Sequence, residues 1–407
     1  MSDQTFVIVG ASLTGAKAAE GMRAEGFDGR LVLIGEESVR PYERPPLSKG
    51  YLRGEEGRDK VYVHDEGFYT EHDIELLTGS RVTVVDPETS QVTLDSGDSI
   101  SYDKLLFATG AEARRLRIDG ADLDGIRYLR SVQDSDGLRA AIEAATRVVV
   151  VGAGWIGSEV AASARQMGRD VALVEMSAVP LERVLGAEMG AFFADLHAAH
   201  GVDMHMGTGV ESFVGDDAVE GIRTSDGDLI EGDLVVVGVG VAPRVALAEQ
   251  AGLDIDNGIL VDEHLQSSRP GVFAAGDVAN AFHPLYGTHL RVEHWSNARN
   301  QGEAAGRSMA GADIIYDRVP YFFSDQYEMG MEYSGFATDW DEVVTRGDPA
   351  GGEFIAFWLK DGAVQAGMNV NVWDVAEPIG ALARSRRQVD ASRLTDPDIP
   401  LDEVIEG

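Results

Sequence analysis

The run Val148-Val-Val-Val151, followed by Gly152-Ala-Gly154-Trp-Ile-Gly157, decides the fold of this chain. Four valines in succession predict a buried strand, and glycines at this spacing predict a tight turn that leads into a helix. A second apolar run, Val171-Ala-Leu-Val174, ends at Glu175. Strand, glycine turn, helix, strand and terminal acid together form the βαβ fingerprint of a dinucleotide-binding domain.

The same design occurs a second time, near the N-terminus. Phe6-Val-Ile-Val-Gly10 predicts a strand, Ala11-Ser-Leu-Thr-Gly15 predicts the turn, and Leu31-Val-Leu-Ile-Gly35 predicts a second strand that leads to Glu36. In both segments the acid stands 21 residues after a turn glycine. The first segment departs from the pattern at Ser12, which takes the place of the middle glycine. Its Cβ leaves less room for a phosphate to approach the backbone, although its hydroxyl can donate a hydrogen bond to the phosphate.

Each turn is expected to hold a pyrophosphate. The first glycine makes the turn, the second lets the phosphates approach the backbone, and the third lets the helix pack on the strand. The free N–H groups at the start of the helix and its positive dipole end then face the phosphates. The residues predicted for this role are Gly10, Ser12 and Gly15 in the first segment, and Gly152, Gly154, Ile156 and Gly157 in the second.

Composition excludes several classes of function. The chain of 407 residues has no cysteine, which rules out disulfides, thiolate metal sites and any redox-active or nucleophilic thiol. Acidic residues outnumber basic residues by 69 to 34, and the net charge is −35. Because this field repels phosphate, we expect neither nucleic acid nor a membrane surface as a partner. No apolar run approaches the roughly 18 residues that span a bilayer, so we expect a cytoplasmic protein.

The rest of the chain predicts further strands and a change of character. Apolar runs ending in small residues occur at 105–110, 234–243 and 271–278, and the last of these places Asp277 just beyond a strand end. After Pro320 the pattern becomes rich in strands. We therefore expect an α/β protein with two Rossmann-like dinucleotide-binding domains and a C-terminal α+β domain.

Three histidines, His197, His200 and His205, come close together in the sequence. They fall on a predicted helix and the strand that follows it, without carboxylates in a ligand-like arrangement. We therefore predict no metal site.

Several motifs resemble those of two-dinucleotide-binding-domain flavoproteins, and specifically of the FAD-dependent NADH:ferredoxin reductases of bacterial oxygenase systems. The resemblance covers essentially the whole chain. The motifs that carry it are Arg44-Pro-Pro-Leu-Ser-Lys49, Gly152-Ala-Gly-Trp-Ile-Gly-Ser-Glu159, Gly276-Asp277, Glu293-His-Trp-Ser-Asn-Ala-Arg-Asn-Gln-Gly302, Ser324-Asp-Gln-Tyr327 and Asn369-Val-Asn-Val-Trp-Asp374.

The resemblance implies that the first segment binds FAD and the second NADH. It implies an FAD-binding domain in two parts, 1–112 and 243–319, an NADH-binding domain at 113–242 and a C-terminal domain at 320–407. The residues implied for FAD are Gly10, Ser12, Gly15, Glu36, Arg44, Lys49, Val82, Thr109, Gly110, Arg130, Asp277 and Trp295. Those implied for NADH are Gly152, Gly154, Ile156, Gly157, Glu159, Glu175, Gly238 and Gly240.

Within these sets, the resemblance gives catalytic roles to three residues. Lys49 would lie near the N5 side of the flavin and pair with Glu159, so that its charge stabilises the reduced flavin and the pair orders the nicotinamide. Trp295 would lie against the flavin. Phe323 departs from the family pattern, which has tryptophan before Ser-Asp-Gln, so a role that needs an indole N–H at this position is in doubt.

The strand-end acid of the second segment favours NADH over NADPH. Glu175 can accept hydrogen bonds from the 2′-hydroxyl of NADH, and it repels the 2′-phosphate of NADPH. The following residues, Met176-Ser-Ala-Val179, include no arginine that would receive this phosphate.

The absence of cysteine sharpens the functional interpretation. Relatives that reduce disulfides or peroxides need a thiol beside the flavin, so here electrons must leave from the flavin itself. The expected function is to take a hydride from NADH onto FAD and to pass electrons singly to a 2Fe-2S ferredoxin that feeds a monooxygenase or dioxygenase. Rubredoxin reductase and monodehydroascorbate reductase remain alternatives, as does a binding protein that resembles apoptosis-inducing factor and responds to NADH. A monomer or a homodimer is expected.

Overall fold

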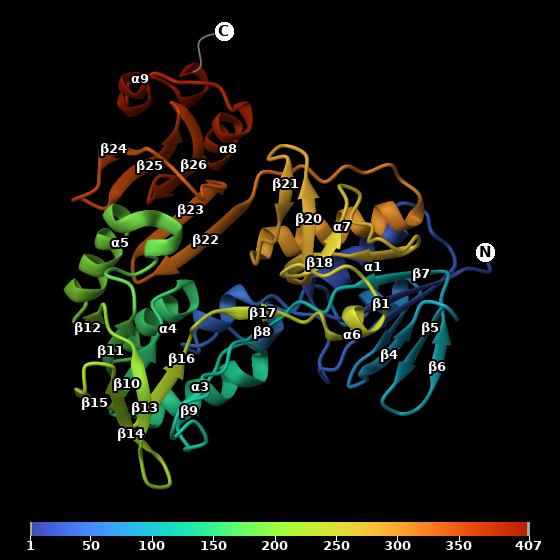
Figure 1. The fold of residues 1–407 in the computed structure, drawn as a ribbon, viewed down its shortest axis with the longest axis horizontal. Coiled ribbons are helices and arrows are strands. Elements are labelled where there is room, and N and C mark those ends of the chain that lie inside the picture. The colour runs from blue at the N-terminus through green and yellow to red at the C-terminus, as the bar shows by residue number, and fades with distance from the viewer. Residues whose placement is uncertain (1, 405–407) are drawn as a thin grey trace. The chain divides into compact units, whose positions relative to one another are not determined.

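A computed structural model gives the structure of the chain and describes residues 2–404. The chain divides into two compact units (Figure 1). Unit 1 comprises Met1–Glu43, Arg58–Glu112 and Ala242–Pro320, and unit 2 comprises Arg44–Gly57, Ala113–Val241 and Tyr321–Gly407. The segment Arg44–Gly57, which the resemblance assigns to the first part of the FAD-binding domain, therefore belongs to unit 2.

Unit 1 is built on a five-stranded parallel sheet with the strand order β19-β7-β1-β2-β3. Its strands are β1 (Thr5–Val9), β2 (Arg30–Ile34), β3 (Ile74–Leu77), β7 (Lys104–Phe107) and β19 (Val272–Ala274). The helices of this unit are α1 (Leu13–Ala24), α2 (Phe68–Glu71), α6 (Ala246–Gln250) and α7 (Trp295–Ala310). The order reverses at β1, which is where open parallel sheets bind ligands at the carboxyl ends of their strands.

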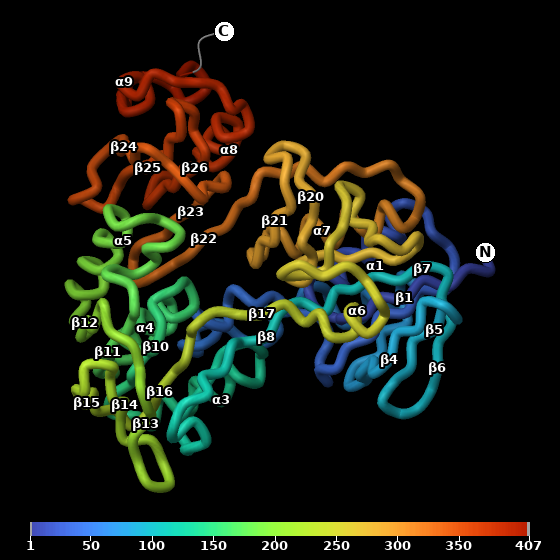
Figure 2. The backbone as a smooth tube through the Cα atoms, in the orientation of Figure 1, coloured from blue at the N-terminus to red at the C-terminus, as the bar shows by residue number. Residues whose placement is uncertain are grey.

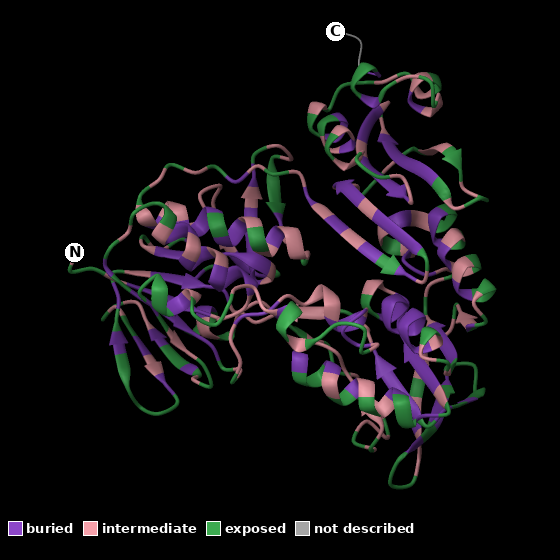
Figure 3. Cartoon of the chain, turned by 180° about the vertical axis from the view of Figure 1, so that it is seen from behind, coloured by how far each residue is buried: buried purple, intermediate pink, exposed green. Residues whose placement is uncertain are grey.

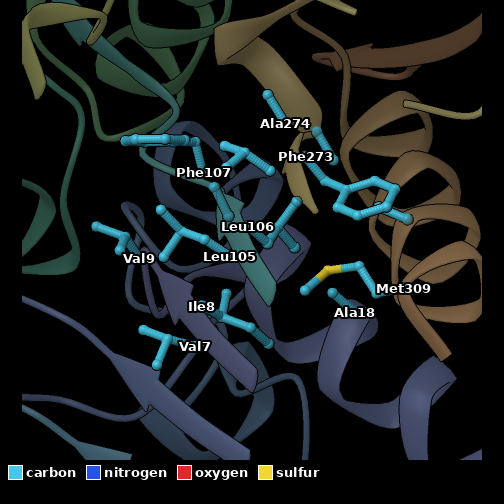
Figure 4. Packing of buried hydrophobic residues seen from close by; sticks show 14 of the residues in the cluster. Val7, Ile8, Val9, Ala18, Leu105, Leu106, Phe107, Phe273, Ala274 and Met309 are labelled. Atoms are coloured by element: carbon cyan, nitrogen blue, oxygen red, sulfur yellow. The ribbon is translucent and has the colours of Figure 1, made fainter. Parts of the chain in front are cut away.

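The core of unit 1 lies between this sheet and its helices. Figure 4 shows side chains of β1, β7 and β19 packed together with Ala18 of α1 and Met309 of α7. Helix α7 lies directly against α1, because Gly306 has no side chain: a Cβ there would be 2.1 Å from the carbonyl oxygen of Ala18. This close approach fixes α7, and with it the position of Trp295 at its first residue.

Two smaller sheets complete unit 1. The antiparallel sheet β4-β5-β6 consists of β4 (Val82–Asp86), β5 (Gln91–Leu94) and β6 (Ser99–Ser101), and its chain path is traced in Figure 2. The other sheet has the order β18-β20-β21, with β18 (Ile259–Val261), β20 (Ala279–His283) and β21 (Thr288–Leu290).

Unit 2 contains a second parallel sheet, with the order β12-β11-β10-β16-β9. Its strands are β9 (Ile126–Arg127), β10 (Arg147–Val151), β11 (Asp170–Glu175), β12 (Asp203–Met206) and β16 (Leu234–Val237). Its helices are α3 (Val132–Ala144), α4 (Trp155–Gln166) and α5 (Glu182–Ala199). An antiparallel sheet of β13 (Val210–Gly215), β14 (Val219–Thr224) and β15 (Leu229–Glu231) packs on it through Phe213, Ile222 and Ile230.

The C-terminal part of unit 2 is an antiparallel sheet with the order β22-β23-β26-β25-β24. Its strands are β22 (Tyr321–Gln326), β23 (Met329–Gly335), β24 (Glu342–Asp348), β25 (Glu353–Lys360) and β26 (Ala363–Val370), and its helices are α8 (Ala376–Ser385) and α9 (Ala391–Thr395). Helix α5 packs on this sheet, since Leu185, Met189 and Phe193 share a buried cluster with Trp358. The predicted α/β class, with two Rossmann-like sheets and a C-terminal α+β domain, is therefore confirmed.

A two-stranded ribbon, β8 (Ala111–Ala113) and β17 (Val241–Pro243), contains two of the points at which the chain passes from one unit to the other. Figure 3 shows that the central strands of both parallel sheets are buried, as the continuous apolar runs predict. Between residues 2 and 404, no helix is both long enough and apolar enough to cross a membrane.

Candidate dinucleotide sites and a buried ion pair

In unit 1 the predicted residues gather at one edge of the parallel sheet. Gly10 follows β1, Glu36 follows β2, Thr109 follows β7 and Asp277 follows β19. Because the strands are parallel, their carboxyl ends share this edge. The edge therefore presents two carboxylates and a glycine turn that come from separate parts of the sequence.

The turn after β1 leaves no room for side chains at its first and last glycine. Gly10 has a φ of +123°, and a Cβ on it would lie 2.1 Å from the carbonyl oxygen of Ala108. A Cβ on Gly15 would lie 2.1 Å from the carbonyl oxygen of Gly10. Ser12, in extended conformation, is the N-cap of α1, so the N–H groups of the first helical turn begin at this position. The geometry fits a bound pyrophosphate.

Glu36 lies in an ion pair that the sequence did not predict. Both Nη atoms of Arg244 donate to its carboxylate, Nη2 at 3.0 Å from Oε2, and this pairing raises the pKa of Arg244. The carbonyl of Arg244 in turn accepts a hydrogen bond from Thr109 Oγ1 at 2.9 Å. Arg244 follows the quoted run 234–243 directly, but nothing in a single sequence pairs it with Glu36.

Local structure is also defined at the other predicted FAD residues of unit 1. Gly110 has a φ of +66°, and Val82 is buried at the start of β4. Asp277 lies in a short 3₁₀ turn, Gly276–Val278, in which a Cβ on Gly276 would be 2.4 Å from Thr14 Oγ1. The turn that presents Asp277 therefore packs closely against α1.

Trp295 begins α7 and has a polar partner that sequence reasoning missed. Its indole N–H donates to the carboxylate of Glu43. Burial raises the pKa of Glu43, and this hydrogen bond offsets part of the effect. The guanidinium of Arg299 lies 5.5 Å from the centre of the Trp295 ring. A hydrogen bond to a carboxylate therefore fixes the Trp295 ring, which distinguishes it from an ordinary apolar core residue.

The glycine turn of unit 2 differs from that of unit 1 in one respect. A Cβ on Gly157 would be 1.9 Å from the carbonyl oxygen of Gly152, and one on Gly152 would be 2.5 Å from that of Gly238. Gly154, the N-cap of α4, has nothing within 4 Å of the position of a Cβ. This open space beside the helix N-terminus is what a pyrophosphate needs.

Glu175 ends β11, at the carboxyl edge of the sheet. Its carboxylate accepts hydrogen bonds from the backbone N–H of Ala153 at 2.7 Å and of Ser177 at 2.9 Å. The carboxylate is thus fixed beside the glycine turn. Ile156 is 45% exposed on the first turn of α4, and Gly240, with a φ of +94°, follows β16.

A buried ion pair in unit 2 joins Lys49 and Glu159. Lys49 Nζ lies 2.9 Å from Glu159 Oε2, and the two side chains are 11% and 4% exposed. Ser48 Oγ donates to the same carboxylate oxygen at 2.5 Å. The pairing that the resemblance implies is therefore present. Lys49 follows a short 3₁₀ turn, Pro45–Ser48, whose prolines pre-set the backbone.

Arg44 and Arg130 also lie in unit 2, and the structure brings them together. Nη1 of Arg44 donates to the carbonyl of Arg130. The resemblance places both residues near FAD, and the structure adds that one guanidinium fixes the backbone of the other residue.

Two protein-family models match this chain. Residues 4–302 match the model of the pyridine nucleotide-disulphide oxidoreductase family, and residues 321–405 match the reductase C-terminal family. The chain belongs to the pyridine nucleotide-disulphide oxidoreductase family. Within this family it is 40% identical to the ferredoxin–NAD(+) reductase component of the anthranilate 1,2-dioxygenase system of Burkholderia cepacia, over 98% of this chain and 97% of that protein.

Other similar proteins are also reductases of electron-transfer proteins. Putidaredoxin reductase of Pseudomonas putida is 35% identical over 99% of this chain and 97% of that protein. A crystal structure of putidaredoxin reductase in covalent complex with putidaredoxin matches with a TM-score of 0.96 over 99% of this chain and 98% of that one, at 35% identity. The chain is thus an oxidoreductase, and the NAD-dependent ferredoxin reductases of its family are FAD flavoproteins that use NADH.

The composition of this chain bears on the disulphide chemistry that the family's name describes. The sequence has no cysteine, so no disulfide of this chain can take part. Among residues 2–404, no three histidine, aspartate or glutamate side chains are grouped as metal ligands. His197 instead hydrogen-bonds the hydroxyl of Tyr327 at 3.0 Å, and His200 stacks on the Tyr327 ring.

Proposed function

We propose that this protein binds FAD in unit 1 and NADH in unit 2, takes a hydride from NADH onto FAD, and passes electrons one at a time to a 2Fe-2S ferredoxin that serves an oxygenase. The observation that carries the proposal is a pair of parallel sheets, each with a glycine turn and a strand-end carboxylate, in a chain without cysteine. The named relatives, which are ferredoxin reductases of oxygenase systems, support the choice of partner.

The residues of unit 1 have distinct roles toward FAD. The turn from Gly10 to Gly15 would hold the pyrophosphate on the first N–H groups of α1, with the Ser12 hydroxyl as an added donor. Glu36 would accept from the adenosine ribose, and Asp277 would accept from the ribityl chain. When bound, FAD supplies the acceptor for a hydride and releases electrons singly.

Unit 2 has matching groups for NADH. The open position at Gly154 would admit the pyrophosphate, and Glu175 would accept from the 2′-hydroxyl of the adenosine ribose. The fixed negative charge of Glu175 would repel the 2′-phosphate of NADPH. This gives a preference for NADH without any contact specific to the nicotinamide.

We propose that Lys49 and Glu159 act as a unit. Glu159 fixes the Lys49 ammonium at 2.9 Å, in a position from which most water is excluded. A cation fixed in this way stabilises negative charge that develops nearby more strongly than a mobile, hydrated one. The pair would also order the nicotinamide, and Trp295 of unit 1 would lie against the flavin.

We propose the domain ranges 1–112 with 243–319, 113–242 and 320–407, a monomer or homodimer, and a cytoplasmic location. Size-exclusion chromatography with light scattering distinguishes a monomer from a dimer.

The central test is an anaerobic titration with NADH, followed by mixing with candidate carriers while the flavin absorbance is recorded. We expect NADH to bleach the flavin, and a 2Fe-2S ferredoxin to restore its absorbance rapidly. Rapid reoxidation by rubredoxin or by the monodehydroascorbate radical, and not by ferredoxins, would replace the proposed partner. Slow turnover with every carrier, together with an NADH-induced change of oligomeric state, would instead indicate a binding protein.

A further inference from the structure

The Glu159 carboxylate receives a hydrogen bond from the C-terminal sheet. Ser324 Oγ, on β22, donates to Glu159 Oε1 at 2.7 Å, whereas Lys49 and Ser48 both approach the other oxygen, Oε2. Ser324 is 0% exposed. Each oxygen of this buried carboxylate therefore has its own donor, as a buried negative charge requires.

A second residue of the same strand orients this serine. Residues 324 and 326 point to the same face of β22, because side chains alternate along a strand. Gln326 Nε2 donates to Ser324 Oγ at 3.3 Å, and Gln326 is fully buried. Since the serine oxygen accepts from Gln326, its own proton is directed toward Glu159.

A buried histidine of α5, His197, lies close to the end of this strand. His197 is fully buried, and its Nδ1 lies 3.0 Å from the Tyr327 hydroxyl. The helix and β22 are also joined by the apolar packing of unit 2. Gln326 is fully buried as well, so rotation of its amide away from Ser324 would give up the hydrogen bond from Nε2 with no water to replace it.

The open face of β22 borders Lys49 as well. Phe323 places its ring 5.5 Å from the Lys49 ammonium, and the charge of Asp325 interacts with the same ammonium. Besides the serine that contacts Glu159, β22 therefore presents an aromatic ring and a carboxylate whose charge acts on Lys49.

We infer that Ser324, oriented by Gln326, is a positioning residue that holds the Glu159 carboxylate, and through it the Lys49 ammonium, in place for hydride transfer. The inference rests on the proposed function for the role of Lys49. It gives the C-terminal domain a part in the reaction with NADH that is separate from any contact with a ferredoxin.

The test compares Ser324→Ala with Ser324→Thr and with a matched control, Ser334→Ala. Ser334 is a buried serine on β23 of the same sheet, and its hydroxyl donates to the carbonyl of Ala376. Stopped-flow reduction of the flavin by NADH is measured over a range of NADH concentrations. We expect Ser324→Ala to lower the limiting rate about tenfold, because it removes a hydrogen bond to a charged group. Ser324→Thr should retain most of the rate, and Ser334→Ala should stay within about twofold of the wild type.

A double-mutant cycle with Glu159→Gln gives a readout that does not depend on activity. The free energies of unfolding of Ser324→Ala, Glu159→Gln and the double variant should be non-additive, because the serine loses its charged acceptor in the Gln variant. Additive effects, or a wild-type reduction rate in Ser324→Ala, would overturn the inference. If wild-type protein is not reduced by NADH, the proposed function fails, while the unfolding cycle still decides whether Ser324 holds Glu159.

Gln326→Met provides a second variant in case Ser324→Ala does not bind FAD. The side chain keeps a similar length but loses the donor to Ser324. We expect a loss of about threefold in the limiting rate at unchanged FAD content. No loss at all would contradict the role of Gln326 in directing the serine hydroxyl.

Discussion

The Lys49 ammonium lies 2.9 Å from the Glu159 carboxylate, and neither side chain is more than 11% exposed. An ion pair on the surface contributes little to stability, whereas the loss of one partner from a buried pair is strongly destabilising. Removal of one partner leaves the other charge buried without compensation. Stability and reactivity should therefore respond differently to single and double substitutions at these two residues.

We predict that Lys49→Met, which keeps the apolar stem, lowers the free energy of unfolding by about 3 kcal/mol. It should also slow hydride transfer from NADH at least about tenfold. The double variant Lys49→Met/Glu159→Gln should recover much of the stability, since no unpaired charge remains, but not the rate. Urea unfolding and single-turnover reduction measure the two effects. The control is Lys60→Met, an exposed lysine, which should change neither. A wild-type reduction rate in Lys49→Met would show that the ammonium has no role in the reaction.

The middle glycine of the NADH turn gives a second prediction. Because Gly154 has a φ of −75° and open space at the Cβ position, Gly154→Ala should leave the unfolding temperature within about 2 °C of the wild type. The added methyl should nevertheless obstruct the pyrophosphate and raise the KM for NADH about tenfold or more. Gly157→Ala, whose Cβ would meet a carbonyl oxygen at 1.9 Å, should destabilise the protein instead. An unchanged KM in Gly154→Ala would place the pyrophosphate elsewhere.

Cofactor choice should depend on the charge of Glu175. Wild-type protein should show the higher kcat/KM with NADH, and Glu175→Gln should narrow the ratio of NADH to NADPH at least about tenfold, because repulsion of the 2′-phosphate is lost. Glutamine keeps one oxygen that can accept from the N–H of Ala153 beside the glycine turn, while the hydrogen bond from Ser177 is lost. Glu211→Gln, an exposed glutamate of the same unit, is the matched control. Steady-state assays in which wild type prefers NADPH would contradict this assignment.

Acid stability should depend on His197. Burial lowers the pKa of His197 to about 4, whereas in the unfolded chain it lies near 6.5. The unfolded chain therefore binds more protons between these values, and stability is present above pH 6.5 and lost as the pH falls toward 4. The loss at the lower limit is about 3 kcal/mol. His294, whose pKa burial also lowers to about 4, contributes in the same window.

We expect His197→Gln to reduce, but not remove, the fall in unfolding midpoint between pH 6.5 and pH 4.5. Glutamine keeps a polar contact for the Tyr327 hydroxyl and does not titrate. Identical pH dependence in His197→Gln and the wild type would mean that His197 does not contribute to it.

The sequence predicted the repeated βαβ segments and the features that depend on neighbouring residues. The two βαβ segments were visible because apolar strands, glycine turns and strand-end acids recur at the same spacing, and both became parallel sheets. Long-range pairs were not visible in this way. Arg244 reaches Glu36 from 208 residues away, and Ser324 reaches Glu159 from 165 residues away. Only the folded chain brings such residues together.

For one of the contacts that were not predicted, the sequence contains a partial signal. Ser324 lies in the motif that carried the resemblance, and alternation along β22 predicts that it shares a face with Gln326. The sequence does not say which face is buried or what lies opposite. For Glu43, the partner of the Trp295 indole, the sequence contains no such signal, because a glutamate before Arg44-Pro-Pro is indistinguishable from a solvated surface residue.

The hydrogen bond from β22 to Glu159 matters for anyone who recombines these reductases. Pro320 is the natural junction for a chimera, because it ends the last segment of unit 1. A foreign C-terminal domain joined there would bring its own residue 324 to the Glu159 of this chain. Transplanted domains should therefore be joined after Gln326, so that the donor to the ion pair stays with the ion pair that it serves.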